Sequence, residues 1–412
     1  MRVLLSTYGS RGDVEPMVGL AVRLQALGAQ VRLCAPPDAE FAERLAGVGV
    51  ALVPTGQPIR AITTGAPPPA AELPRRAAGV LAAQFDAVLA ATADGCDAVV
   101  ASGLFPAAAG AQSAAEKLGV RYVYVSYQPT TLPSAYHPPH PYPGRPLPPD
   151  VSDNRVLWDL NTETMNVLFA APVNTHRVSI GLPPVADVRD HVFTDRPWLA
   201  TDPVLSPWPA TDLDVVQTGA WILPDERPLP AELVAFLDAG TPPVYVGFGS
   251  MSMHAAKNAA RVAIEAIRAQ GRRAVVSHGW AELTLIDDHD DCFAVGEVNQ
   301  QALFGRVAAV VHHGGAGTTT TAARAGTPQV VLPQIVDQPY WAGRVADLGI
   351  GVAHDGPTPT TESLSAALSA VLTPEIRTRA RGVADAIRAD GATVAATLLL
   401  YAVDRAWTRL SA

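Results

Sequence analysis

The stretch that decides the fold runs from Val310 to Gln338 and reads VVHHGGAGTTTTAARAGTPQVVLPQIVDQ. An apolar run that begins at Val307 enters it, and a segment of small residues from Thr319 to Ala325 follows the glycines. A second apolar run, 329–332, leads into a loop with Asp337-Gln338. This order of apolar runs and turn residues predicts strand, glycine-rich turn, helix, strand and loop.

The glycine-rich turn has two interpretations. Glycines allow a ligand to approach the backbone, and the start of the next helix offers N–H groups and a partial positive charge, which together favour phosphate. A strand that only turns tightly into a helix would use glycine as well. The histidines before the turn and Asp337-Gln338 after the next strand favour a ligand site, because open α/β sheets bind ligands where polar groups follow neighbouring strands.

Length and composition indicate a globular protein of two domains. The chain has 412 residues, of which 48% are hydrophobic and 17% are charged. A net charge of −9 argues against nucleic acid or an anionic membrane as the partner. The three cysteines, Cys34, Cys96 and Cys292, are widely spaced beside apolar runs, which predicts small buried side chains and no metal site.

No membrane segment is expected. The first apolar run breaks at Ser6 and Gly9 and is too short for a signal peptide. No uninterrupted apolar stretch of about 18 residues occurs. We therefore expect a cytoplasmic protein.

The first half of the chain alternates strands and helices. Apolar positions within 14–27 have helical spacing and end at Gly28, between strands at 2–7 and 31–35. Further helices are predicted at 38–46, 76–92 and 107–118, and further strands at 50–53, 97–102 and 121–126. This alternation predicts a parallel sheet with helices on both faces.

Residues 129–149 are dominated by proline, which excludes a helix interior or a central strand. The segment is either a linker or a long binding loop, and we favour a loop that binds a ligand. Gln128, Tyr136 and Tyr142 are its candidate contacts. A helix is expected over 158–171, and 174–180 is expected to continue that helix after Pro172.

The stretch 200–230 is punctuated by proline and has little periodicity, so we place the domain boundary there. Alternation then resumes. Helices are predicted at 230–238, 254–270, 299–305, 340–348, 361–372, 374–388 and 391–407, and strands at 243–248, 273–277, 292–295 and 307–311. The halves therefore indicate two doubly wound α/β domains.

The sequence resembles the antibiotic glycosyltransferases of glycosyltransferase family 1, and within them the enzymes that modify vancomycin- and teicoplanin-type glycopeptides. The resemblance rests on HHGGAGT, AGTPQVVLP and DQPYWAGRVADLGIGVA near the motif, and on MRVLLSTYGSRGDVEP, VQTGAWILPDERPL, PVYVGFGS and SHGWAEL elsewhere. It covers essentially the whole chain, and 128–175 is the least matched part.

The resemblance implies the GT-B fold, in which two doubly wound domains face each other across a cleft. The acceptor-binding domain would span 1–213 with a linker to about 230, and the nucleotide-sugar-binding domain 214–395. The proline-rich loops 55–74 and 129–149, with Gln128, Tyr136 and Tyr142, would face the acceptor. The final helix, 396–412, would pack back on the first domain. The resemblance also implies the donor-binding residues: Ser10, Arg11, Gly12, Ser250, Trp280, His312, Gly314, Gly315, Ala316, Gly317, Thr318, Asp337 and Gln338.

Within that set the resemblance implies different roles. His312 and the glycine-rich turn would hold the diphosphate, and Trp280 would stack on the base. Asp337 and Gln338 would bond sugar hydroxyls. Asp13 matches the proposed catalytic base of the family, with Asp337 as the alternative, although Asp13 also suits a helix start, where the dipole favours a carboxylate. Plant relatives use a histidine near the end of their first strand, and this chain departs from them.

A metal is not expected to carry the diphosphate. Many glycosyltransferases use an Asp-x-Asp pair for this, and the only dense acidic cluster here is Asp287, Asp288, Asp290 and Asp291 around His289. We interpret it as a solvated loop. Backbone N–H groups, a helix dipole and side-chain donors must then stabilise the leaving group. No other cofactor is expected.

Three functions remain in view. The leading one is an inverting transfer of a sugar, with UDP-glucose-type donors favoured over deoxyaminosugars on dTDP, to a phenolic or benzylic hydroxyl of a glycopeptide aglycone. A sugar-nucleotide epimerase or hydrolase of the same fold would need no organic acceptor. A non-catalytic partner protein is disfavoured, because Asp13, His312 and Asp337-Gln338 are all present.

Overall fold

The computed structural model describes residues 1–63, 70–142, 144–249, 256–279, 283 and 285–410. The chain divides into two compact units, and each is described by itself. The first contains Met1–Asp202, Trp208–Leu223 and Arg388–Ala412, and the second contains Pro203–Pro207 and Pro224–Ile387. The chain thus leaves the first unit and returns to it at its end.

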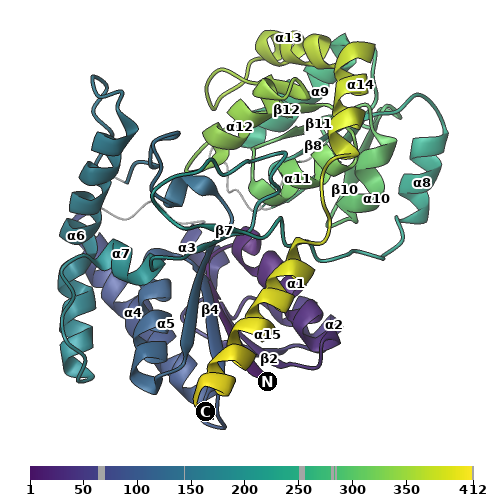
Figure 1. Ribbon diagram of the computed structural model, residues 1–412. Coiled ribbons are helices and arrows are strands. Elements are labelled where there is room, and N and C mark those ends of the chain that lie inside the picture. The colour runs from purple at the N-terminus through teal and green to yellow at the C-terminus, as the bar shows by residue number, and fades with distance from the viewer. Residues whose placement is uncertain (64–69, 143, 250–255, 280–282, 284, 411–412) are drawn as a thin grey trace. The chain divides into compact units, whose positions relative to one another are not determined.

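The first unit alternates strands with helices through most of its length (Figure 1). Its strands are β1 (Arg2–Tyr8), β2 (Gln30–Ala35), β3 (Ala51–Pro54), β4 (Ala98–Gly103), β5 (Arg121–Ser126), β6 (Trp198–Leu199) and β7 (Val216–Gln217). Its helices are α1 (Arg11–Ala26), α2 (Ala39–Gly47), α3 (Ile59–Thr63), α4 (Leu73–Ala91), α5 (Phe105–Leu118), α6 (Asn154–Ser179), α7 (Val188–Phe193) and α15 (Gly391–Leu410), with short 3-10 turns at Ala70–Glu72 and Pro129–Thr131.

The second unit repeats the alternation. Its strands are β8 (Val244–Gly247), β9 (Ala274–Ser277), β10 (Cys292–Val295), β11 (Ala309–His312), β12 (Gln329–Val331) and β13 (Gly351–Ala353). Its helices are α8 (Ala231–Asp238), α9 (Ala256–Ala269), α10 (Gln300–Leu303), α11 (Ala316–Arg324), α12 (Gln338–Asp347), α13 (Thr361–Val371) and α14 (Pro374–Ala384), with a 3-10 turn at Phe304–Arg306.

Both sheets are parallel, as predicted. The strand order is β3-β2-β1-β4-β5-β6-β7 in the first unit and β10-β9-β8-β11-β12-β13 in the second. In each sheet the order reverses beside the first strand, between β1 and β4 and between β8 and β11. Loops leave in opposite directions at such a point, so the carboxyl ends of these four strands are where a ligand is expected.

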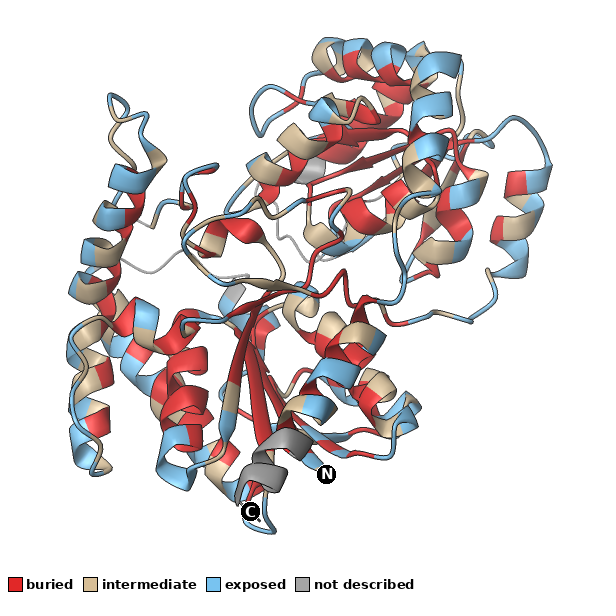
Figure 2. Ribbon diagram, viewed as in Figure 1, coloured by how far each residue is buried: buried red, intermediate tan, exposed pale blue. Residues whose placement is uncertain are grey.

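The strands are buried because helices cover both faces of each sheet (Figure 2). In the first unit Leu4, Val99 and Ala101 pack with Phe85 and Ala111 of α4 and α5. In the second, a core that includes β8, β11 and β12 packs against α9 and α13. Parallel strands buried in this way read as continuous apolar runs, which explains why the sequence revealed them.

Two helices begin earlier in the structure than the sequence predicted, because a capping residue precedes each of them. Helix α1 begins at Arg11, and not at 14, because Ser10 caps it and its hydroxyl accepts from the N–H of Gly12 at 3.4 Å. Helix α6 begins at Asn154, since Asp153 accepts from the N–H of Arg155 at 2.9 Å. It then runs unbroken through Pro172.

The proline-punctuated stretch 200–230 is less irregular than predicted. It contains the two-residue strand β7, which pairs with β6 and so extends the first sheet. Strands of two residues carry no readable alternation, which is why periodicity did not reveal them.

The last helix, α15, belongs to the first unit and packs on α1. Its first residue, Gly391, lies against the backbone of Gly219, which has a φ of +92°. A Cβ at Gly391 would lie 2.4 Å from the carbonyl carbon of Gly219 and 2.5 Å from the carbonyl oxygen of Ala220. Two backbones therefore cross here with no room for a side chain.

This crossing predicts the effect of one methyl group. We expect Gly391→Ala to lower the free energy of unfolding by about 1–3 kcal/mol, because backbone atoms must move apart to admit the Cβ. Gly382→Ala is the control, since a Cβ there meets nothing within 4 Å. The control should be neutral or more stable by up to about 1 kcal/mol, as expected for alanine in a helix. Urea titrations followed by circular dichroism measure both, and equal effects would contradict the assignment.

Candidate functional site

The glycine-rich turn of the second unit connects β11 to α11 at the point where the strand order reverses. Gly315 occupies the N-cap position of α11 and offers no side chain to cap it. The N–H groups of Ala316, Gly317 and Thr318 lie in the first turn, where they have no partner within the helix and no side chain caps them. Such groups favour an anion.

The threonines after the turn contribute less than their number suggests. Thr319, Thr320 and Thr321 each donate the hydroxyl to a carbonyl four residues earlier, at 2.9, 2.7 and 2.8 Å. These hydroxyls serve the helix and do not face a ligand. Thr318 is the one that remains beside the turn, and its side chain is partly exposed.

His312 is fully buried, and both of its ring nitrogens have partners. Its Nε2 lies 2.9 Å from Oε1 of Gln329, and its Nδ1 accepts the N–H of Gly314 at 3.1 Å. Burial lowers its pKa to about 3, helped by His313. The side chain is a neutral brace for the turn, so its contacts do not support the direct phosphate contact predicted for His312.

His313 is the histidine that lies against the turn. A Cβ on Gly315 would come within 2.6 Å of its Nε2, and a Cβ on Gly249 within 3.1 Å of its Cε1. Its Nδ1 is buried without a hydrogen-bond partner among the residues that the structure describes. Desolvation lowers its pKa to about 4, so this imidazole is neutral at pH 7. The sequence marked the histidine pair as part of a ligand site but gave the diphosphate contact to His312 alone.

Asp337 and Gln338 follow β12, and the structure brings them beside the turn. Gly314 has a φ of +93°, and a Cβ there would lie 3.2 Å from the carbonyl oxygen of Gln338. The side-chain oxygen of Gln338 accepts the N–H groups of Gln334 at 2.8 Å and Ile335 at 3.2 Å, which holds the loop before it. The loop and the turn therefore form one group.

The carboxylate of Asp337 occupies a desolvated position. Trp341, which is 1% exposed, donates its ring N–H to Oδ2 of Asp337 at 2.7 Å. Burial outweighs this bond and raises the pKa of Asp337 to about 6. The preceding residue, Val336, has a φ of +57°, which a β-branched residue rarely adopts. Strain and a desolvated acid together are typical of a functional loop.

In the first unit, Asp13 lies in the first turn of α1, beyond the end of β1. Its carboxylate folds back over Gly9, because a Cβ on Gly9 would lie 2.1 Å from Oδ2 of Asp13. Ser10 is the cap of this helix, and Arg11 pairs with Glu15 at 3.7 Å. Gly12 is exposed. Of the residues predicted at this helix start, Asp13 is the one whose carboxylate reaches back over the end of β1.

Two predicted donor contacts, Ser250 and Trp280, lie outside the described residues. Their roles stay predictions.

The predicted acceptor residues differ in their surroundings. Tyr136 is 64% exposed, and Gln128 lies at the end of β5, where its side-chain oxygen is 3.4 Å from the hydroxyl of Thr130. Tyr142 packs into the core against Phe169, with 6.0 Å between ring centroids. Tyr136 is therefore the better placed of the two tyrosines for contact with a ligand.

The acidic cluster is not a simple solvated loop. Arg268 donates to Asp287 at 2.7 and 2.8 Å and to Asp291 at 2.8 and 2.7 Å. These bonds hold the pKa of Asp287 at about 2. Together with His289 these carboxylates have metal-like spacing within the described part of the chain. Since one guanidinium already bridges both, the group carries no argument for a metal.

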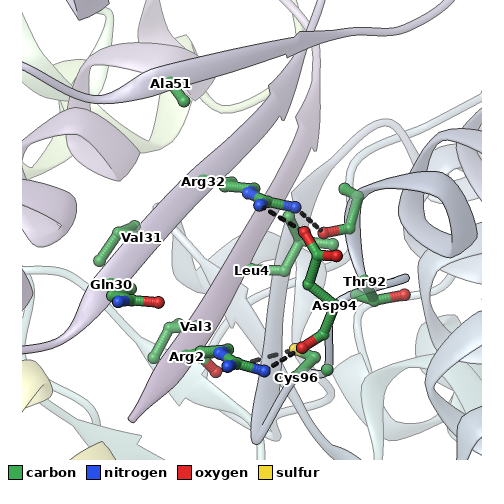
Figure 3. A pocket seen from close by; sticks show the side chains of 12 residues that line it. Arg2, Val3, Leu4, Gln30, Val31, Arg32, Ala51, Thr92, Asp94 and Cys96 are labelled. Atoms are coloured by element: carbon green, nitrogen blue, oxygen red, sulfur yellow. Dashed lines mark hydrogen bonds and ion pairs between the residues drawn. The ribbon is translucent and has the colours of Figure 1, made fainter.

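A cavity of about 330 Å³ opens at the other end of the first sheet, where the strands begin (Figure 3). Its arginines are engaged with α4 and the loop that follows it. Arg32 donates to the carbonyl of Ala91 at 2.7 Å and to Asp94 at 3.1 Å, and Arg2 donates to the carbonyl of Asp94. These bonds satisfy helix-end carbonyls, so the cavity is a structural feature.

Asp337 is partly buried, and the desolvation of its carboxylate predicts a pH-dependent stability. Because its pKa is raised, Asp337 holds its proton more tightly in the folded protein than in the unfolded chain. Ionisation of Asp337 therefore lowers the free energy of unfolding, and this loss is absent below about pH 4 and grows as the pH rises to about 6. Asp337→Asn keeps an acceptor for Trp341 and removes the charge. We expect it to raise the free energy of unfolding by about 2–3 kcal/mol at pH 8 and by little at pH 4.

Denaturant titrations at both pH values measure this difference. The exposed Asp288→Asn is the matched control and should change little at either pH. If Asp337→Asn raised the free energy of unfolding equally at pH 4 and pH 8, desolvation of the charged carboxylate would not be the cause of the increase.

In the described part of the chain, every helix is too short or too polar to cross a bilayer.

Comparison with known families assigns each half of the chain. The family model for the glycosyltransferase family 28 N-terminal domain matches residues 3–137. The model for the erythromycin biosynthesis protein CIII-like C-terminal domain matches residues 285–396. The second match includes the whole glycine-rich turn and Asp337-Gln338.

Curated relatives align over nearly the full length. Glycosyltransferase GtfE of Amycolatopsis orientalis is 60% identical over 98% of both chains. The vancomycin aglycone glucosyltransferase of the same organism is 59% identical over 100% of both chains. The dTDP-epi-vancosaminyltransferase, also from Amycolatopsis orientalis, is 56% identical over 93% of both.

Solved structures agree on the fold. The glycotransferase of kitacinnamycin superposes with a TM-score of 0.73 at 20% identity, covering 97% of this chain and 98% of that one. Glycosyltransferase VinC, in complex with dTDP, gives 0.67 at 20% identity and covers 98% and 100%. With the turn, the Asp-Gln loop and the full-length relatives together, the chain belongs to the GT-B glycosyltransferases that modify glycopeptide antibiotics, the family of GtfE and the vancomycin aglycone glucosyltransferase.

Proposed function

We propose that this enzyme transfers a sugar, with inversion, from a nucleoside diphosphate donor of the UDP-glucose type to a phenolic or benzylic hydroxyl of a glycopeptide aglycone. The observation that carries the proposal is the contact between the turn at Gly314 and the loop at Gln338. It joins a set of anion-binding N–H groups to a carboxylate and an amide suited to sugar hydroxyls. The relatives named for vancomycin support the acceptor class.

The diphosphate binds at the start of α11. The N–H groups of Ala316 to Thr318 and the helix dipole stabilise the negative charge that develops on the leaving group. His313 adds a donor from its imidazole. Because burial keeps this ring neutral, it binds phosphate through an N–H group, and a bound dianion raises its pKa.

The sugar lies against Asp337 and Gln338. Desolvation raises the pKa of Asp337 because its carboxylate has lost hydrogen bonds to water. A sugar hydroxyl that donates to the carboxylate replaces one of these bonds, so sugar binding reduces the free-energy cost of the charged form. Gln338 keeps its side-chain oxygen in the loop and fixes the backbone that presents Asp337.

Asp13 is the base. The acceptor hydroxyl gives its proton to the Asp13 carboxylate while its oxygen attacks the anomeric carbon, and the bond from that carbon to the diphosphate oxygen breaks. Attack opposite the leaving group inverts the carbon. A phenol, with a pKa of about 10, needs only a modest base. Asp337 is the alternative base.

The two donor classes have nearly equal support from sequence identity, at 59% for the glucosyltransferase and 56% for the dTDP-sugar transferase. The intact Asp337-Gln338 pair favours the UDP-glucose type, since both side chains suit a sugar with its hydroxyls in place. The 129–149 and 55–74 loops are assigned to the acceptor, and the second of these lies partly outside the described residues.

One experiment tests the function directly. The aglycone is incubated with UDP-glucose, UDP-N-acetylglucosamine and a dTDP-deoxyaminosugar in parallel, and products are read by mass spectrometry. We expect a hexose adduct from UDP-glucose, formed only with aglycone and at an unchanged single-turnover rate in EDTA. Conversion of the donor without aglycone would point to an epimerase or hydrolase, and complete loss in EDTA would contradict metal independence.

The two histidines should respond differently to substitution. We expect His313→Ala to weaken UDP binding by about 10–100-fold, the worth of a hydrogen bond to a charged group. Asp337→Ala should leave UDP affinity within a few-fold while it damages transfer. His312→Ala should chiefly lower the melting temperature, because it leaves Gln329 and the N–H of Gly314 unpaired.

Isothermal titration with UDP and thermal unfolding measure all three variants. If His312→Ala abolished UDP binding at an unchanged melting temperature while His313→Ala bound normally, the assignment of the phosphate contact would be reversed.

A further inference from the structure

Three hydroxyl groups lie at the carboxyl ends of three neighbouring strands in the first unit, near Asp13. Thr7 is on β1, Ser102 is on β4, and Tyr127 follows β5, and these strands are adjacent in the sheet. Thr7 and Ser102 are register partners, 0% and 3% exposed. We refer to these three residues as the hydroxyl row.

The row lies on the face of the sheet that α1 covers. Ser6 points to the opposite face, where Gln84 of α4 donates to its hydroxyl at 2.6 Å. Side chains alternate along a strand, so Thr7 points to the α1 side. Asp13, in the first turn of α1, folds back over Gly9 toward the end of the same strand.

Two members of the row are poorly satisfied. The hydroxyl oxygens of Thr7 and Tyr127 are buried, and neither makes a hydrogen bond of normal geometry to a described residue, although the Ser102 hydroxyl lies close enough to Tyr127 to lower its pKa. Buried polar groups are nearly always satisfied, and an ordered water is a common partner when several such groups converge. Burial and the nearby charge of Asp13 raise the pKa of Tyr127 well above 10, so its hydroxyl keeps its proton and can donate.

We propose that Thr7 and Tyr127 hold one ordered water against the Asp13 carboxylate and that Tyr127 is a positioning residue for the proton transfer. The water accepts from the Tyr127 hydroxyl and donates to Asp13 and to Oγ1 of Thr7. It keeps the carboxylate turned toward the strand end and ready for the acceptor proton, which Asp13 itself receives. The inference rests on the proposed role of Asp13 as the base.

Few other titratable groups surround Asp13. On α1 they are Arg11 and Glu15, which pair with each other, and Glu15 also pairs with Arg44 of α2 at 3.3 Å; at the strand ends they are Tyr8, Tyr124 and Tyr127. On the approach to α15, which packs on α1, they are Arg388 and Asp390, which also pair. Strand β4 carries none. A shift in the pH profile on loss of the Tyr127 hydroxyl therefore reports on Asp13.

The test removes the hydroxyls one at a time, with Tyr127→Phe and Thr7→Val. We expect Tyr127→Phe to lower kcat about tenfold and the KM of the aglycone to change less than twofold. The acidic limb of the kcat profile should move to higher pH, because a carboxylate that loses a donated hydrogen bond holds its proton more tightly. Thr7→Val should act in the same direction more weakly.

Tyr122→Phe is the matched control, since that partly buried tyrosine lies on β5 and donates to the carbonyl of Ala108 at 3.4 Å. It should leave kcat and the pH profile unchanged. Melting temperatures of all variants show whether each is folded. In an Asp13→Asn background, measured in single turnover, Tyr127→Phe should cause no further loss.

The outcomes separate this inference from the function. Asp13→Asn at the wild-type rate would remove Asp13 as the base and this inference with it. A slow Asp13→Asn enzyme with a Tyr127→Phe variant that behaves like the Tyr122→Phe control would remove only the role of Tyr127. If Tyr127→Phe lowered the rate of transfer by the same factor in the wild-type and Asp13→Asn backgrounds, the Tyr127 hydroxyl would act on a group other than Asp13.

Discussion

The candidate site of the second unit depends on one close approach of two backbones, the turn at Gly314 and the loop at Gln338. Parallel strands make this approach possible because β11 and β12 end at the same edge of the sheet. A side chain at Gly314 would push the loop away, since its Cβ would also lie 2.7 Å from Val331. His312 and Gln338 hold the two partners from within, each by accepting backbone N–H groups. The turn and the loop thereby form one surface, which we propose holds both the diphosphate and the sugar.

This surface relies on oriented dipoles more than on charged side chains. Both histidines are neutral because burial lowers their pKa values to about 3 and 4. The one acid, Asp337, is held partly toward its neutral form. In a protein with a net charge of −9, such an arrangement avoids a strongly charged site before the donor binds. Under the proposed function, the diphosphate would bring its charge to N–H groups that are already in place, so little reorganisation would be needed during transfer.

The sequence predicted the two parallel sheets and most helices, because long apolar runs and glycine or proline boundaries are local signals. It did not predict β6 and β7, whose two-residue length carries no periodicity. Near the site, local pattern marked a histidine pair before a turn but did not separate the roles of its members. That distinction comes from tertiary contacts, in which Gln329 engages His312 and Gly249 and Gly315 flank His313. The pairing of Arg268 with Asp287 and Asp291 was equally invisible, since these residues meet only after folding.

The return of α15 to the first unit limits where recombination can exchange the second unit. The second unit is an insertion in the chain of the first, bounded near Leu223 and Arg388, and not a tail that follows it. Recombination that replaces everything after residue 215 would exchange α15 as well and would pack a foreign α15 on the parental α1. A cassette of 224–387 keeps both the α1–α15 packing and the tight Gly219–Gly391 crossing in the parent that supplies the first unit. Natural and laboratory shuffling of sugar specificity in such enzymes should therefore favour two crossover points over one.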